Sequence, residues 1–550
     1  MLMLRKPAMV VIMLLVSLVG ACAPQVGGPT PTPAGTGAVP KATSGAVSVA
    51  TPKPAVEKPQ RGGTLVYAIR GEAGELDPAQ VTTGMTMFYG QFMFNTLLEI
   101  DSAGQVRPGL AESWSYPDPK TLVLNLRKGV KFHDGTDFNA EAVKFNIGRM
   151  IGNPATDPYQ AGPQYGRTLL ADVKSVDVID NYTVKFNLGT PQAALLGNLT
   201  INAAAAMFSP TAVKKWDKET RVHPVGTGPF EFVEWVKDDH LTVKRFDGYW
   251  RKDEYGDQLP YLDRVTMKPI VDASVRLTNL RTGDVDLTAE LEPAQLPMVE
   301  ADKSLKTAQW GSSANRIFLN NAAPPFDNKA LRQAVAWAID RESIVKELYG
   351  AIGEASKYML GSRGWAFDPT GKFYTKDNAK AKAKLAEGGK PNGFKFVAKI
   401  SNAPLPLRVA QALKAQLAEV GIEMEIFPLA EAQLVSERNA MNYEASFGTG
   451  TASDVDPNTT LYPFLHSKGR QYTKYINSEV DKLLDKAATT YDQAERKVLY
   501  AQVQALVLDD SPYIFLQDGP LVSAMNQKVM GFIPNIDLYH LQWDWLWLKK

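Results

Sequence analysis

Alternation of apolar and polar positions predicts short β-strands throughout the chain after residue 60. Residues 64–69 form an apolar, β-rich run that predicts a buried strand. Residues 121–126 and 182–188 are two further predicted strands, and the second alternates with a clear period of two. We therefore expect a sheet-containing body that begins just after Arg61-Gly62-Gly63.

Helical periodicity appears between these strands. Residues 328–348 carry apolar side chains at helical spacing, with a break near Asp340-Arg341 where a second helix starts. Asn139 is a candidate N-cap for a helix that follows the turn at Asp134-Gly135. Further elements are expected as a helix over 407–420 stopped by Gly421, a strand over 422–427 and a final helical region over 479–510 that ends at Ser511-Pro512. The alternation predicts an α/β fold.

The first 60 residues do not share this pattern. Arg5-Lys6, an apolar stretch over about residues 9–19 and the small residues before Cys22 are typical of a secretory signal peptide over residues 1–21. The apolar stretch has about a dozen residues, whereas a bilayer-spanning helix needs roughly 20. Residues 23–60 are rich in Pro, Gly, Ala, Thr and Ser and lack aromatic side chains, so they are expected to form a disordered tether.

The composition excludes several kinds of chemistry. The chain has 550 residues and one cysteine, so an internal disulfide, a four-cysteine zinc site and a CxxC redox pair are excluded. A net charge of +1 and the lack of a dense basic run argue against nucleic acid as a partner. The five histidines show no metal-binding spacing. We expect no cofactor, no metal and no catalytic residue.

Four motifs in order carry a family resemblance. They are residues 110–135 (LAESW to LRKGVKFHDG, with the helix opening at 140–143), 224–230 (PVGTGPF, followed by DGYW at 247–250), 280–287 (LRTGDVDL) and 325–343 (PFD to AWAIDRES). This set resembles the bacterial extracellular solute-binding proteins of family 5, the peptide- and nickel-type receptors of ABC importers. The Val-Gly-Ala-Cys ending at Cys22 also resembles a bacterial lipobox, which implies acylation of Cys22; an incidental cysteine in a plain signal peptide is the alternative.

The resemblance implies a two-lobe, type II periplasmic-binding-protein-like α/β fold with an additional inserted domain. Carried over to this chain, the first lobe would comprise residues 61–93, 224–305 and 526–550. The inserted domain would comprise residues 94–223 and the second lobe residues 306–525, after a lipidated Cys22 and tether over 22–60. A ligand would be trapped between the lobes as they close, and the loaded receptor would present both lobes to the permease subunits.

Two motif loops have competing interpretations. The glycines and proline of residues 225–229 favour a sharp junction between strands near a domain crossing. A phosphate-binding loop is the alternative, but residues 229–233 read as a strand rather than the start of a helix. His133-Asp134-Gly135 is interpreted as a turn before a capped helix, rather than as a metal-binding or catalytic pair.

Asp454 is the candidate anchor for a peptide amine, as the resemblance implies. Peptide-binding relatives carry an acidic residue four positions before a proline, whereas this chain has Ser453 there and Asp454 three positions before Pro457. Either Asp454 acts after a local shift, or the anchor is missing and the cargo is not an ordinary peptide. Asp454 and Asp456 could instead bond local backbone N–H groups in a turn.

Aromatic and hydroxyl side chains in predicted loops complete the candidate ligand contacts. They are Thr82, Thr83, Phe88, Tyr89, Trp365, Phe367 and Phe447. Aromatics in such loops can grip apolar side chains or stack on sugars, although most aromatics belong to the core. The alternating tryptophans of residues 543–547 predict a strand that packs within a lobe.

The sequence thus predicts an exported, monomeric receptor for peptides or a similar small solute. It would be lipid-anchored through Cys22 at the outer face of the cytoplasmic membrane or in the periplasm. An oligosaccharide or a metal chelate is the alternative cargo. An exported hydrolase or a chaperone-like protein on the same scaffold is the alternative of another class, but no GxSxG, nucleophile–base pair or carboxylate pair is legible.

Overall fold

The computed structural model divides the chain into a unit of residues 1–57 and a unit of residues 58–550. The described residues are 57–80, 84–152, 164–362, 364–450, 455–470, 472–535, 537 and 540–550. The predicted signal peptide, Cys22 and nearly all of the predicted tether therefore lie outside the described residues. The second unit is the body of the protein, and it is described below.

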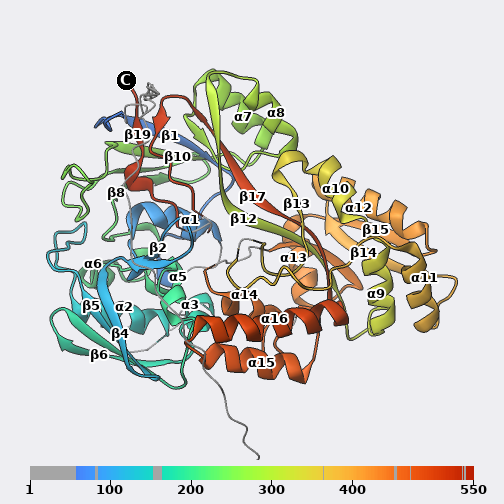
Figure 1. The fold of residues 1–550 in the computed structure, drawn as a ribbon. Helices are drawn as coiled ribbons and strands as arrows, with labels where there is room; N and C mark the ends of the chain where they lie inside the picture. Colours follow the sequence, from blue (N-terminus) through green and yellow to red (C-terminus); the bar gives the residue numbers. More distant parts are fainter. Residues whose placement is uncertain are drawn as a thin grey trace, which may run out of the picture. The chain divides into compact units, whose positions relative to one another are not determined.

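An 11-stranded mixed sheet runs through the body (Figure 1). Its order is β15-β14-β16-β12-β17-β11-β1-β10-β9-β8, and β13 pairs with β17 outside this path. The strands are β1 (Thr64–Ile69), β8 (Phe230–Val236), β9 (His240–Arg245), β10 (Arg264–Pro269), β11 (Leu287–Thr288), β12 (Leu305–Leu319), β13 (Glu354–Ala355), β14 (Lys395–Ser401), β15 (Glu423–Leu429), β16 (Ala445–Gly450) and β17 (Tyr513–Asn526). We call the β11–β8 part the first lobe and the β16–β15 part the second lobe. The predicted α/β class is confirmed.

Strands β12 and β17 are shared by both lobes and lie side by side across Figure 1. The start of β12 pairs with the end of β17 from Leu305↔Asn526, next to β11, whereas the end of β12 also pairs with β16 up to Leu319↔Ala445. The β12–β17 register shifts twice, between Trp310 and Ser313 and between Asn315 and Arg316. These β-bulges interrupt the ladder where the strands pass between the lobes, and such interruptions let a pair bend.

Helices of the second lobe begin where the sequence indicates. Asn328 caps α9 through the N–H of Ala330, and Asp340 caps α10 through the N–H of Ser343, so the predicted break at Asp340 is confirmed. The helical region predicted over 479–510 consists of two helices, because Asp492 starts a new one. The helices are α9 (Lys329–Ala338), α10 (Arg341–Leu348), α11 (Asn378–Glu387), α12 (Pro404–Ala418), α13 (Glu431–Asn439), α14 (Pro457–Leu465), α15 (Ser478–Thr489) and α16 (Gln493–Asp510).

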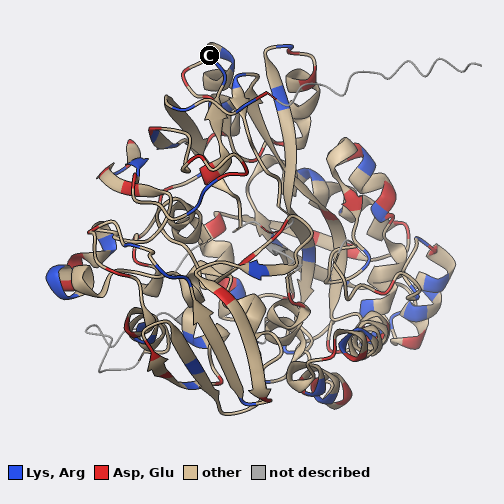
Figure 2. Ribbon diagram, turned by 60° about the vertical axis from the view of Figure 1, so that its left-hand side comes forward, with Lys and Arg blue, Asp and Glu red and all other residues tan. Residues whose placement is uncertain are grey.

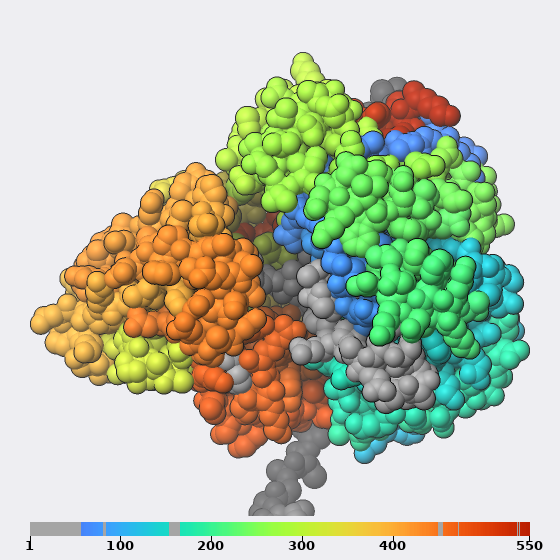
Figure 3. All heavy atoms as spheres, turned by 180° about the vertical axis from the view of Figure 1, so that it is seen from behind, coloured from blue at the N-terminus to red at the C-terminus, as the bar shows by residue number. Residues whose placement is uncertain are grey.

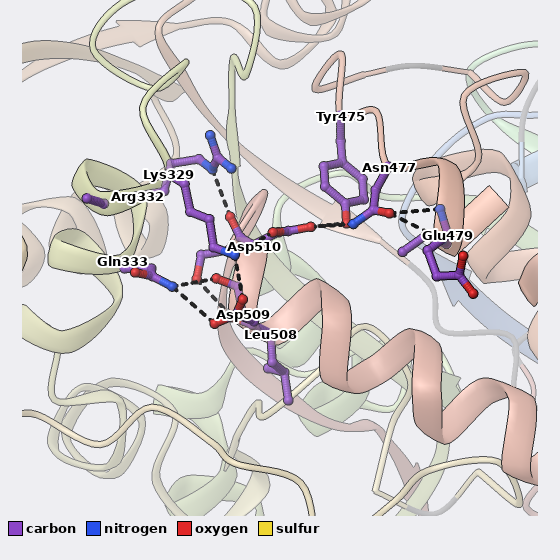
Figure 4. Close-up of polar contacts among 12 residues, drawn as sticks. Lys329, Arg332, Gln333, Tyr475, Asn477, Glu479, Leu508, Asp509 and Asp510 are labelled. Atoms are coloured by element: carbon purple, nitrogen blue, oxygen red, sulfur yellow. Dashed lines mark hydrogen bonds and ion pairs between the residues drawn. The ribbon is translucent and has the colours of Figure 1, made fainter.

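A polar cluster joins the C-terminal end of α16 to α9 and to the segment before α15 (Figure 4). The Asp510 carboxylate accepts hydrogen bonds of 2.7 Å from Tyr475 Oη and from Asn477 Nδ2, and it pairs with Lys329 Nζ at 2.8 Å. Burial acts to raise the pKa of Asp510, but these donors outweigh it and lower the pKa. The stabilisation from this carboxylate is therefore present above its unfolded-state pKa and is lost as the pH falls through its folded-state pKa.

Residues between α1 and β8 form a second sheet of order β4-β5-β7-β6, with a core of its own. The predicted strand over 121–126 coincides with β5, and Asn139 caps α2 as predicted by accepting from the N–H of Ala142. The elements here are β2 (Leu98–Ile100), β3 (Val106–Pro108), β4 (Ala111–Asp118), β5 (Thr121–Leu126), α2 (Ala140–Met150), α3 (Gln164–Leu169), β6 (Val173–Asp180), β7 (Thr183–Leu188), α4 (Leu195–Asn198), α5 (Asn202–Ala205) and α6 (Pro210–Trp216). The predicted limits of the lobes and the inserted domain stay predictions.

Further elements lie outside these sets. They are α1 (Gly84–Met93), α7 (Ala273–Thr282), α8 (Leu296–Glu300), β18 (Val529–Met530) and β19 (Trp547–Leu548), with 3-10 turns over Pro78–Gln80, Asp217–Val222, Pro293–Gln295, Gly350–Ile352 and Trp543–Trp545. The predicted strand over 543–547 is wrong for its first half, which is a 3-10 turn. This turn sends Trp543 into the core with Phe92, at a ring separation of 4.5 Å, and Trp547 into a separate cluster with Tyr261.

The glycine motif before β8 packs against the end of α1. A Cβ on Gly226 would lie 2.1 Å from the carbonyl oxygen of Met93, so the close approach requires glycine. His133 lies in the predicted turn, where Nε2 donates to the Gly228 carbonyl at 3.0 Å and Nδ1 accepts the Gly226 N–H at 3.3 Å. Burial lowers the pKa of His133 to about 4, so the imidazole that makes these two hydrogen bonds is neutral.

Candidate functional site

A large cavity lies where the crossing strands meet both lobes. Its volume is about 480 Å³. The first lobe contributes Arg70, Glu290, Leu291 and Pro293; the crossing strands contribute Ser312, Ser313, Asn315, Gln517, Pro520, Leu521 and Val522; the second lobe contributes Tyr349, Ile352, Leu405 and Pro406. In the space-filling view of Figure 3, orange residues of the second lobe and blue and green residues of the first border a hollow.

We call this space the hinge cavity, and its position follows from the strand directions. Strand β1 runs parallel to β10 and β11 in the first lobe, and β14 runs parallel to β15 and β16 in the second. Arg70 directly follows β1, Glu290 follows β11, and Leu405 comes just after β14. Ligands of open α/β sheets bind outside the carboxyl ends of parallel strands. Here the carboxyl ends from both lobes face one cavity.

Glu290 supplies a charged group on the first-lobe wall. Its carboxylate pairs with Arg70 Nη1 at 3.1 Å, while Arg276 donates to its backbone carbonyl at 3.1 Å. Burial raises the pKa of Glu290, and the charges of Arg70 and Arg276 oppose this rise only in part. Glu290 also has a φ of 51°, a left-handed conformation that costs a non-glycine residue roughly 1–3 kcal/mol and that clusters at functional sites.

A smaller chamber of about 60 Å³ shares Asn315, Tyr349 and Pro406 with the hinge cavity. Phe447, one of the predicted ligand contacts, lines this chamber and is 7% exposed. Arg316 lies beside it on β12 and is only 2% exposed. The two cavities therefore share part of their walls.

Two predicted site residues, Trp365 and Asp456, meet at Arg496. The Asp456 carboxylate accepts hydrogen bonds of 2.7 and 2.8 Å from the two terminal nitrogens of Arg496, and both side chains are buried. The same guanidinium lies 5.4 Å from the ring centre of Trp365. Asp456 also caps α14 by accepting the Asn458 N–H at 2.9 Å. Asp456 therefore anchors the chain after residue 454 to α16.

The structure distributes the other predicted contacts among different places. Phe88 and Tyr89 lie in the first-lobe core, where Phe88 packs 5.7 Å from Trp543 and Tyr89 donates to the Gly71 carbonyl at 3.1 Å. Phe367 stacks on Phe373 at 5.8 Å. Thr82, Thr83 and Asp454 lie outside the described residues, so their roles stay predictions.

Sequence reasoning missed Arg70, Glu290, Asn315, Arg316 and Gln517. A charged residue inside the apolar run of residues 316–319 is a signal for Arg316, because arginine is rare in a buried strand. The other four carry no such signal, since only long-range strand pairing brings them to one cavity. Within the described residues, no cluster of three or more His, Cys, Asp or Glu side chains could hold a metal ion.

A family model for bacterial extracellular solute-binding proteins, family 5 Middle, matches residues 105–472, which is more than half of the chain. The chain belongs to this family. Its members are the solute-binding receptors of ABC importers, as the sequence motifs predict, and the type II periplasmic-binding-protein fold is confirmed by solved structures. No helix in the described part of the chain combines the length and the apolar character that a membrane crossing requires.

Relatives in this family match nearly the whole body. The glutathione-binding protein GsiB of Shigella boydii serotype 4 (strain Sb227) is 32% identical over 489 residues, which cover 85% of this chain and 91% of that protein. The periplasmic binding protein DppA of Helicobacter pylori, solved in complex with peptide STSA, has a TM-score of 0.78 and 27% identity, covering 89% of this chain and 99% of that chain. The oligopeptide-binding protein AppA of Bacillus subtilis, solved with a nonapeptide, has a TM-score of 0.75 and 26% identity. The match covers 90% of this chain and 100% of that chain.

The Arg496–Asp456 pair generates a stability prediction. Arg496→Met should lower the free energy of unfolding by about 3–5 kcal/mol, because it leaves a buried carboxylate without its counter-charge. Lys486→Met is the matched control, since Lys486 pairs with Glu495 on the surface and should cost less than about 1 kcal/mol. Urea denaturation followed by circular dichroism measures both values. Equal stabilities of the two variants would contradict the anchoring role of Arg496.

Proposed function

We propose that this protein is a peptide receptor that captures its ligand in the hinge cavity and passes it to the permease of an ABC importer. The observation that carries the proposal is the cavity of about 480 Å³ at the carboxyl ends of strands from both lobes. Charged groups of both signs line these two neighbouring cavities, which suits a zwitterionic peptide. The ligands of the relatives, glutathione and peptide STSA, support peptides as the cargo class.

Capture would proceed by closure of the two lobes about the crossing strands. The two β-bulges in β12–β17 and the positive φ of Gly311, 59°, lie where the strands leave the first lobe. Bending there would move the second-lobe wall, with Tyr349 and Pro406, against Arg70 and Glu290. The receptor would signal loading through this closed arrangement and perform no chemical step on its cargo.

We further propose that the protein acts as a monomer tethered outside the cytoplasmic membrane. Acylation at Cys22 and the Pro-rich segment that follows would keep the body near its permease while leaving it free to reorient. Basic and acidic residues are interspersed over the outer helices and loops (Figure 2). With a net charge of +1, recognition of a charged ligand depends on local groups in the cavity.

Peptide binding and closure should be measured on the same purified protein. We expect calorimetry to detect binding of Ser-Thr-Ser-Ala or glutathione, and small-angle scattering to show a smaller radius of gyration with the bound peptide. An oligosaccharide or a metal chelate as the only co-purified ligand in mass spectrometry would contradict the peptide assignment. Hydrolysis of the peptides at enzyme-like rates would contradict a receptor without chemistry. Unchanged scattering at saturating peptide would contradict closure.

Asp454 is the proposed anchor for the peptide amine. Asp454→Ala should weaken binding of Ser-Thr-Ser-Ala at least tenfold, or about 1.4 kcal/mol, because a carboxylate opposite the ammonium group is lost. Glu300→Ala is the matched control, since it removes an exposed carboxylate on α8 that lines neither cavity. The N-acetylated peptide should bind both variants equally. An unchanged affinity in Asp454→Ala, measured by calorimetry, would remove Asp454 from the site.

The lipid anchor has a direct cellular test. Cys22→Ser should release the protein from the membrane fraction of a bacterial host, because serine cannot carry the thioether-linked lipid. Ser17→Ala is the control, since it changes the leader and leaves Cys22 intact. Immunoblots of membrane and soluble fractions measure the distribution. Retention of Cys22→Ser in the membrane fraction would contradict acylation at this residue.

A further inference from the structure

The second lobe contacts the sheet β4-β5-β7-β6 at the corner between α15 and α16. We call this sheet the inserted sheet. Tyr491 lies at the corner, and its ring centre is 4.6 Å from that of Tyr116 on β4. The Tyr491 hydroxyl donates to the Pro119 carbonyl at 2.8 Å and accepts the Gln192 N–H at 3.3 Å. One side chain of the second lobe thus contacts three residues in and around the inserted sheet.

A backbone hydrogen bond joins the same corner to the same partner. The Ala488 carbonyl lies in the last turn of α15, where carbonyl groups have no N–H partner within the helix. The Ala193 N–H donates to this carbonyl at 2.8 Å. Gln192 and Ala193 are consecutive residues between β7 and α4, so two neighbouring N–H groups both donate to the second lobe. The end of α15 is therefore a defined docking point for this segment.

Helix α4 packs against the second lobe beside the corner. A Cβ on Gly197 would lie 3.2 Å from Val455 Cγ1 and 3.4 Å from Asp456 Cβ, so α4 approaches this segment closely. Asp456 is held in turn by Arg496 on α16. Figure 1 shows α15 and α16 beside the inserted sheet. The second-lobe side of the contact is thus built on two long helices.

These contacts are separate from the hinge and from the two cavities. In the part of the chain that the structure describes, none of the contacting residues lines the hinge cavity or the smaller chamber. Among the described strands, no pairing links the inserted sheet to the second lobe. A bend in the crossing strands that moves the second lobe away would therefore have to break the corner contacts. They belong to the closed arrangement alone.

We propose that the α15–α16 corner is a latch that holds the second lobe on the inserted sheet, so that Tyr491 raises the affinity for every ligand without contacting any of them. The proposal rests on the peptide-receptor function and adds a determinant of affinity outside the cavities. Contacts made only in the closed state stabilise it relative to an open one. This difference adds to the apparent affinity for any ligand that the closed lobes enclose.

Removal of one hydroxyl group tests the latch. Tyr491→Phe loses two hydrogen bonds and keeps the ring beside Tyr116, so affinity for Ser-Thr-Ser-Ala should fall about fivefold. Affinity for glutathione should fall by the same factor, because the latch contacts neither ligand. The loss should come from faster dissociation, since the lobes open more readily, with little change in the association rate. Surface plasmon resonance measures both rates.

Tyr116→Phe is the matched control. It removes the neighbouring hydroxyl, which is buried and has no hydrogen-bond partner, so both rates should stay at their wild-type values. An unchanged dissociation rate in Tyr491→Phe would overturn the latch, and so would an equal acceleration in Tyr116→Phe. A loss for only one of the two ligands would overturn it too, because Tyr491 would then act as a ligand contact. Each of these results leaves the peptide-receptor function intact, since wild-type protein still binds.

A measurement without ligand separates the latch from the proposed function. Failure of both ligands to bind wild-type protein would count against the peptide-receptor function, whereas the latch can still be tested by small-angle scattering. Tyr491→Ala removes the ring and both hydrogen bonds, so the ligand-free variant should have a larger radius of gyration than wild-type protein. Tyr255→Ala is the control, because it removes an exposed tyrosine of the first lobe. An unchanged radius of gyration in Tyr491→Ala would overturn the latch.

Discussion

The antiparallel pairing of β12 with β17 is the constraint on which the rest of the body depends. Both strands run from the first lobe to the second, so their paired length connects the two lobes. A shift of one residue in such a pair would turn every side chain to the opposite face. The register therefore fixes which residues of the crossing strands line the hinge cavity, and the two β-bulges are where the pair can bend without losing that register.

Local signals in the sequence predicted several elements because they act within a few residues. Asn139, Asn328 and Asp340 cap helices through N–H groups two or three positions later, so short polar motifs were sufficient. Alternation located β7 for the same reason. The strand predicted over residues 543–547 was wrong for its first half. Its apolar periodicity resembled that of a strand, but Trp543 and Trp547 pack in two separate hydrophobic clusters. Tertiary packing overrides local pattern at such a place.

The candidate site was harder to predict, because its residues come together only through the sheet. Phe447 was predicted as a ligand contact, and it lines the smaller chamber. Phe88 was predicted as a contact too, but it lies in the core, as most aromatic side chains do. Glu290 and Asn315 are 25 positions apart and carry no shared motif. They line the same cavity because β11 pairs with β17, and β17 pairs with β12. No local window contains that information.

Loading and closure would share one energetic origin in the hinge cavity. Its walls come from both lobes and from the crossing strands, so a ligand would contact all of them at once only where the lobes surround it. A ligand shifts a conformational equilibrium only by its differential affinity for the two states. Contacts with the second wall would be a direct source of such a difference, because they would form in the closed arrangement and be absent from an open one. The closed state would then depend on the presence of cargo, which is the behaviour an import receptor needs in order to report loading.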